Sequence, residues 1–153
     1  YELGELRRMR GERGVEDAFE QATSFGHVAQ PGLALFRLGQ GNAQAADAGL
    51  RRVLAERERA ADRLILLPAA VEVCLATGRI DDAKEVVAEM AHIVHTYPTT
   101  AMRATLDAAQ GAVALSEDRP ADALARLRGA SDWWRELDAP YETAQVGVRI
   151  GQA

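Results

Sequence analysis

The sequence contains a single cysteine and no long apolar run. Cys74 is the one cysteine among 153 residues, so no disulfide can form within the chain, and we expect a reducing, cytoplasmic location. No apolar run approaches the roughly 18 residues of a membrane span, so we expect no membrane partner. The first residue, Tyr1, lies inside a helical pattern, and we therefore expect the chain to be a fragment of a longer protein.

Clusters of basic residues are also missing. The net charge is −5, and the 18 lysine and arginine residues are spread along the chain. Binding a phosphate backbone requires clustered basic side chains, so we expect contact with DNA only through another domain of the parent protein. Aromatic residues make up only 5 %, but 48 % hydrophobic and 27 % charged residues are a balance typical of a folded domain.

A pattern of turns and helices recurs along the chain. Four predicted turn residues, Gly11, Gly41, Gly78 and Asp118, are separated by 30, 37 and 40 residues. After each of the last three comes a small residue, followed four and then three positions later by further apolar residues. Groups at this spacing share one face of a helix, so each unit is predicted to have a second helix with one buried stripe. The stripes are Ala46, Leu50 and Val53; Ala83, Val87 and Met90; and Ala123, Leu127 and Ala130.

A pair that contains a small residue also recurs in the first helix of each unit, beginning eight residues before the turn. The pairs are Leu3-Gly4, Leu33-Ala34, Ala70-Val71 and Gln110-Gly111, and Ile150-Gly151 begins a fifth. This arrangement resembles the tetratricopeptide repeat, although that family has a period of about 34 residues. The resemblance implies an all-α fold: a tetratricopeptide-like superhelix of antiparallel helix pairs, with about four repeats and a partial fifth, in a single domain over residues 1–153.

The same periodicity predicts helices and no β-sheet. Asp118 and Asp138 each precede a proline by two residues, an arrangement that favours an N-cap followed by proline in the first turn. The expected helices are 1–10, 14–26, 31–39, 43–58, 61–77, 81–96, 99–116, 119–136 and 139–152.

No group of residues forms a complete catalytic, cofactor or metal motif, so we expect a protein that is not an enzyme, with no cofactor and no metal. Glu89, His92 and His95 have the spacing of half a di-iron site, but its other half is missing, which favours surface histidines. Residues 39–41 begin a nucleotide-binding glycine pattern, yet they follow a predicted helix rather than a strand. Cys74 is predicted to be a small buried core residue.

The first helices would line the concave surface of such a superhelix. This largely apolar groove suits a protein or peptide partner, such as an apolar helix, or a small hydrophobic effector. Trp134 continues a buried stripe, whereas Trp133 is a candidate interface residue, with packing against the next repeat as the alternative. The predicted concave-face residues are Glu5, Arg8, Met9, Leu35, Leu38, Glu72, Leu75, Ala112 and Leu115.

Two stretches, residues 30–41 (QPGLALFRLGQG) and 136–142 (ELDAPYE), resemble the helical-repeat region of large bacterial LuxR-type transcriptional regulators. Such proteins join an ATPase module, tetratricopeptide-like repeats and a helix-turn-helix domain that binds DNA. The resemblance implies a sensor or assembly region that binds an effector or partner and takes part in signal transduction. The alternatives are a stand-alone adaptor for a peptide and the repeat region of another signalling protein. Self-association into a homo-oligomer is left open.

Overall fold

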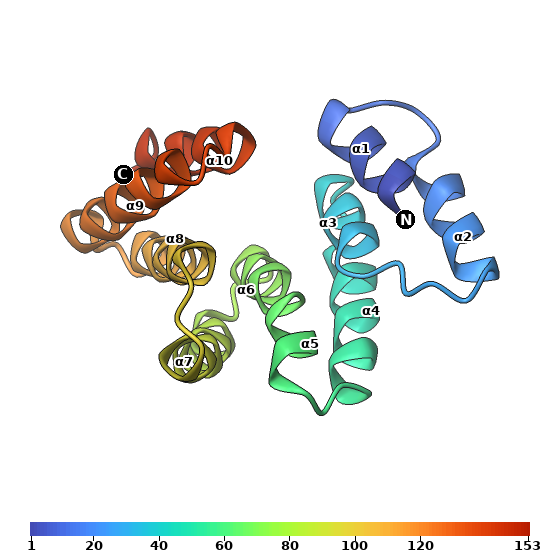
Figure 1. The fold of residues 1–153 in the computed structure, drawn as a ribbon, viewed down its shortest axis with the longest axis horizontal. Helices are drawn as coiled ribbons and strands as arrows, with labels where there is room; N and C mark the ends of the chain where they lie inside the picture. The colour runs from blue at the N-terminus through green and yellow to red at the C-terminus, as the bar shows by residue number, and fades with distance from the viewer. The chain divides into compact units, whose positions relative to one another are not determined.

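The computed structural model describes residues 1–153 and contains ten α-helices and no strand, which confirms the all-α prediction. No helix combines the length and apolar character that a membrane crossing requires. The chain forms two compact units, Tyr1–Thr77 (unit 1) and Gly78–Ala153 (unit 2). Unit 1 holds α1 (Glu2–Arg10), α2 (Val15–Ser24), α3 (Gly32–Gly39), α4 (Ala43–Ala55), α5 (Ala60–Leu64) and α6 (Leu67–Ala76) (Figure 1). Unit 2 holds α7 (Ile80–Thr96), α8 (Thr100–Ser116), α9 (Pro120–Glu136) and α10 (Pro140–Ile150).

The helix predicted over 61–77 is wrong as a single element, because the structure has α5 and α6 there. Pro68 occupies the first turn of α6. Proline has no N–H to donate, and its ring clashes with the carbonyl four residues earlier, so α5 cannot continue through it. Ile65 and Leu66 instead form a turn, in which the Leu66 N–H donates to the Arg63 carbonyl at 2.8 Å. The other eight predicted helices agree with the structure to within three residues at each end.

The four predicted turn residues all have left-handed backbone conformations, which confirms their role. Their φ angles are 66° at Gly11, 78° at Gly41, 72° at Gly78 and 56° at Asp118. Only a residue with little steric hindrance enters this region readily, so glycine is favoured there and aspartate is tolerated.

The Asp118 turn has a Schellman geometry. The Arg119 N–H donates to the Ala114 carbonyl at 2.9 Å, and the Asp118 N–H donates to the Leu115 carbonyl at 3.1 Å. The predicted N-cap role of Asp118 is therefore wrong, since Asp118 follows the end of α8 and Arg119 occupies the N-cap position of α9, with no capping hydrogen bond from its side chain. Asp138, with φ of 52°, takes the same role after α9.

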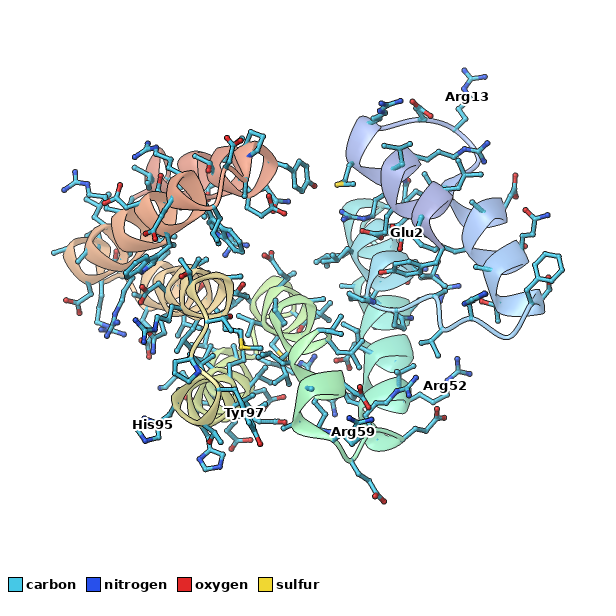
Figure 2. The ribbon with its side chains drawn as sticks, viewed as in Figure 1. Glu2, Arg13, Arg52, Arg59, His95 and Tyr97 are labelled. Carbon is cyan, nitrogen blue, oxygen red and sulfur yellow. The ribbon has the colours of Figure 1, made fainter.

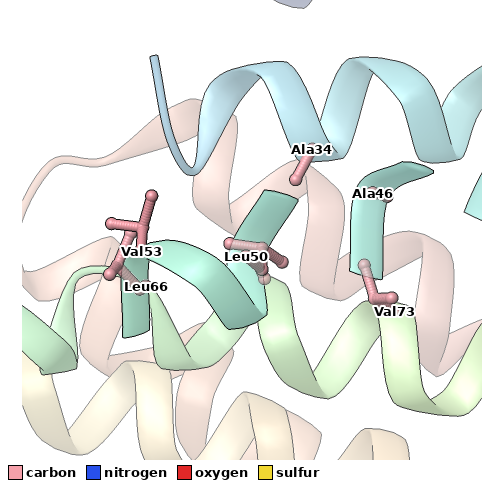
Figure 3. Close-up of a cluster of buried hydrophobic side chains, with 7 residues drawn as sticks. Ala34, Ala46, Leu50, Val53, Leu66 and Val73 are labelled. Atoms are coloured by element: carbon pink, nitrogen blue, oxygen red, sulfur yellow. The ribbon is translucent and has the colours of Figure 1, made fainter. Parts of the chain in front are cut away.

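Two clusters of buried residues lie in the core of unit 1. The first surrounds Phe19 of α2, which is fully buried. It packs over Gly4 of α1, where an added Cβ would lie 2.7 Å from the ring, so glycine allows the two helices to approach closely. The second lies between α3, α4 and α6 (Figure 3) and consists of Ala34, Ala46, Leu50, Val53, Leu66, Ala69 and Val73.

Unit 2 repeats this close approach in a longer helix pair. Leu127 of α9 is fully buried and packs over Gly111 of α8, where an added Cβ would lie 2.6 Å from its Cγ. The surrounding cluster extends to Val146 of α10 and includes Ala114, Ala123 and Ala130. In both units, then, a glycine of a first helix lies beneath a large apolar side chain of the next helix.

Candidate interaction surface

Within unit 1 the first helices of the successive pairs are neighbours. α1 contacts α3, and α3 contacts α6, so the residues predicted for the concave face of this unit lie on adjacent helices. On α1, Glu5 and Arg8 form an ion pair at 2.9 Å, with side chains 19 % and 17 % exposed. Each charge largely neutralises the other. Met9, the third predicted residue of α1, is apolar and 43 % exposed.

The Glu5 carboxylate occupies the space where a side chain on Gly32 would begin. Glycine at this position therefore lets α1 approach the start of α3 closely. The sequence analysis did not identify Gly32, because its partner lies on another helix and no spacing rule connects them. Its location directly after Pro31, at the start of an apolar stretch, is the one local signal.

The remaining predicted residues of unit 1 divide between core and surface. Leu35 and Leu38 of α3 are half-buried and pack against the cluster around Leu50. Glu72 and Leu75 of α6 are half-buried. This row of first helices therefore presents partly accessible leucine side chains next to the charged groups of Glu5, Arg8 and Glu72.

In unit 2 the predicted residues contribute mainly to packing. Ala112 is only 4 % exposed, and Leu115 packs against the cluster that contains Leu127. Trp134 is half-buried and packs against the same cluster. Trp133 is half-buried, so part of its indole ring is accessible to a partner.

The residues weighed for chemistry are dispersed. His92 and His95 are exposed on α7, and Figure 2 shows His95 projecting outward. No three histidine, cysteine, aspartate or glutamate residues are grouped so that they could hold a metal ion. Cys74 is buried, as predicted, and forms no disulfide. Residues 39–41 close α3 as a turn.

One hollow in unit 1 was not foreseen from the sequence. It has a volume of about 560 Å³ and opens to solvent. Burial, reinforced by the negative charge of Glu5, raises the pKa of the Tyr1 phenol above its ordinary value of 10.0. The lining residues are Tyr1, Glu2, Leu3, His27, Val28, Gln30 and Ile65.

The side chain of Gln30 helps to order the wall of this hollow. Its Oε1 accepts a hydrogen bond from the Ala34 N–H at 3.1 Å, which satisfies one free donor at the start of α3. Its Nε2 would lie 2.6 Å from a Cβ added to Gly49 of α4.

No protein-family model, curated protein or solved structure matches the chain.

Proposed function

We propose that the chain is a non-catalytic, tetratricopeptide-like scaffold that binds a protein partner or a small effector. The observation that carries this proposal is the recurring packing unit. In the α1–α2 and α8–α9 pairs, a glycine of the first helix lies under Phe19 or Leu127 of the second, and a left-handed residue closes the turn. Stacked units of this kind form extended binding surfaces rather than enclosed active sites.

The binding surface in this proposal is the row of first helices in unit 1. Met9, Leu35 and Leu38 contribute apolar area, and the Glu5–Arg8 pair adds little net charge. An amphipathic helix or a hydrophobic effector suits such a surface. The ligand would act by favouring one arrangement of the repeats over another, which requires that its affinity differ between them.

We further propose that the parent is a cytoplasmic transcriptional regulator of the LuxR type, with this chain as its sensor or assembly region. The two stretches at residues 30–41 and 136–142 support the assignment, and the buried thiol of Cys74 suits a reducing compartment. In this proposal, DNA binding and nucleotide hydrolysis belong to other domains of the parent.

The first experiment is to read the native coding sequence on both sides of this chain. A helix-turn-helix module downstream, with a phosphate-loop ATPase upstream, is the expected result. A frame that closes soon after residue 153 with a polar capping helix would contradict the regulator and favour a peptide adaptor.

A second experiment tests the binding surface in the parent protein. Met9→Glu places a charge on the accessible apolar surface of α1, and we expect it to abolish effector-dependent transcription from a reporter. Gln21→Glu adds the same charge to an exposed residue of α2 and serves as the matched control. The same loss of response in both variants would contradict the proposed surface, and so would an unchanged response in both.

A further inference from the structure

Two junctions between successive helix pairs each carry an ion pair. A junction is the contact between the second helix of one pair and the first helix of the next, such as α2–α3 in unit 1 or α7–α8 in unit 2. In the α7–α8 junction, Lys84 Nζ lies 3.1 Å from Glu117 Oε1. In the α2–α3 junction, Arg37 Nη2 lies 3.6 Å from Glu16 Oε1. The acid and the base have thus changed places between the two junctions.

The two ion pairs occupy the same position in the repeat. Glu16 and Lys84 each directly follow the first buried residue of their helix. Arg37 lies in the last turn of α3, and Glu117 directly follows α8. Each ion pair therefore joins the beginning of a second helix to the end of the first helix that follows it.

The chain itself connects the two helices of a junction at the opposite edge. Helices α7 and α8 run antiparallel and are joined by residues 97–99, far from Lys84 and Glu117. Each helix has 17 residues, so roughly 20–25 Å of helix separates the loop from the ion pair. A rotation of about 10° about the loop would separate the charged ends by about 4 Å, enough to break the ion pair.

The Lys84–Glu117 ion pair is accessible to solvent, so its strength depends on the surrounding salt. The two side chains are 49 % and 23 % exposed. Asp81 also contacts Lys84, and Arg119 also contacts Glu117, which makes the ion pair part of a chain of alternating charges. Salt screens exposed charges of this kind and leaves the apolar contacts between the helices in place.

We propose that the α7–α8 junction is a hinge whose opening is limited by the Lys84–Glu117 ion pair. The loop at residues 97–99 is the pivot, and the ion pair holds the opposite edge closed. Low ionic strength favours the closed junction, and high ionic strength releases it. An exposed ion pair shifts such an equilibrium by at most about fivefold, so the angle changes gradually with salt and not as an all-or-none switch.

Distances between two spin labels, measured in the full chain by pulsed electron resonance, test this hinge. The labels are attached through Ala88→Cys on α7 and Ala125→Cys on α9, both exposed positions outside the ion pair. Because Leu127 of α9 packs tightly over Gly111 of α8, the label on α9 also reports the position of α8. Cys74→Ala removes the native thiol from the labelling reaction, and circular dichroism verifies that every variant is helical.

We expect one dominant distance in the labelled chain at low salt. Lys84→Gln removes the charge and should raise the fraction of longer distances by up to about fivefold. High salt should have the same effect on the chain that retains Lys84, and little further effect on Lys84→Gln. Lys84→Arg preserves the charge and should keep the low-salt distance.

A second ion pair of unit 2 provides the matched control. Arg126 of α9 and Asp107 of α8 also lie 3.1 Å apart, but they join the two helices of one pair and do not cross the junction. Asp107→Asn should therefore leave the label distances unchanged.

Three results would overturn the proposal. Unchanged distances in Lys84→Gln at low salt would mean that apolar packing alone fixes the junction. An equal response to salt with and without Lys84 would assign the salt dependence to other charges. The same change in Asp107→Asn would show that loss of any ion pair loosens the unit. The measurement uses no effector, so its outcome is independent of the proposed function.

Discussion

The α1–α2 pair of unit 1 and the α8–α9 pair of unit 2 pack around equivalent contacts. Gly4 lies under Phe19 in the first pair, and Gly111 lies under Leu127 in the second. The pairs differ in length, since α1 and α2 have 9 and 10 residues whereas α8 and α9 have 17 each. A short pair buries fewer other residues, so we expect it to depend more heavily on the one large side chain.

The two turns within these pairs also differ. Gly11 occupies the left-handed position after α1, and Asp118 occupies it after α8. A side chain in this conformation is disfavoured, so the longer pair tolerates a less favourable turn residue. From these two differences we infer that the α8–α9 pair can lose a stabilising contact and remain folded, whereas the α1–α2 pair cannot.

Truncating the two buried side chains gives the largest expected effects. Phe19→Ala should destabilise the protein by about 3–5 kcal/mol, and Leu127→Ala by about 2–5 kcal/mol, because each leaves a cavity in a packed core. Urea unfolding measures the total loss, and hydrogen exchange of the amides in each pair shows where it occurs.

If helix length decides the outcome, Phe19→Ala should remove exchange protection throughout α1 and α2. Leu127→Ala should leave most of the protection in α8 and α9. A larger loss of protection in the longer pair would contradict the comparison.

Alanine at two glycines of unit 2 should have effects of opposite sign. Gly111→Ala forces a Cβ to within 2.6 Å of Leu127 and should cost about 1–3 kcal/mol. Gly147→Ala on α10 meets no atom within 4 Å and should stabilise the helix by about 0.5–1 kcal/mol. Thermal unfolding followed by circular dichroism measures both variants. If both substitutions shifted the unfolding temperature in the same direction, close packing against Leu127 would not be the reason for glycine at position 111.

The sequence predicted most of the helices because apolar spacing and left-handed turn residues mark their ends. It missed the break between α5 and α6, where Pro68 lies inside a continuous apolar stretch and no change of periodicity appears. It gave Asp118 two roles, turn residue and N-cap, of which only the first is correct, because aspartate is favoured as an N-cap and also tolerated in a left-handed turn. In both places the local sequence pattern is compatible with two different backbone structures.

The candidate surface was harder to predict because the spacing of residues identifies which side of a helix they share but not how deeply each side chain is buried. Ala112 belongs to the predicted concave-face set, yet it is nearly fully buried, since a small side chain is covered by its neighbours. Gly32 was missed because its role depends on Glu5, which approaches from another helix. Such contacts between helices have no signature in a single sequence.

The turn residues provide a smaller test of the same comparison. Asp118→Gly should stabilise the α8–α9 pair by up to about 1 kcal/mol, because glycine enters the left-handed region without steric cost. The reciprocal variant, Gly11→Asp, should destabilise the α1–α2 pair by a similar amount. Chemical denaturation compares the two, and an unchanged midpoint for Asp118→Gly would mean that the aspartate side chain makes a compensating contribution.

The smallest expected effect concerns the charges beside the two turns. Near the α8–α9 turn, Lys84 of α7 lies 3.1 Å from Glu117, which also accepts a hydrogen bond from Arg119. Near the α1–α2 turn, the corresponding pair is looser, with Arg10 and Glu12 at 3.6 Å. The bond from Arg119, followed by that from Lys84, lowers the pKa of the Glu117 carboxyl, and the bond to Glu117 raises the pKa of Lys84.

These shifts predict how Glu117→Gln depends on pH. A lowered carboxyl pKa stabilises the fold above the ordinary value of 4.5, and this contribution disappears as the pH falls through the lowered pKa. The raised pKa of Lys84 stabilises the fold below 10.5 and loses its effect only above it. Urea midpoints should therefore show Glu117→Gln slightly less stable near neutral pH and equal to the unmodified chain in acid. Because both charges are exposed, added salt should shrink the difference at neutral pH, and a difference that persists in acid would mean that Glu117 acts through packing instead of charge.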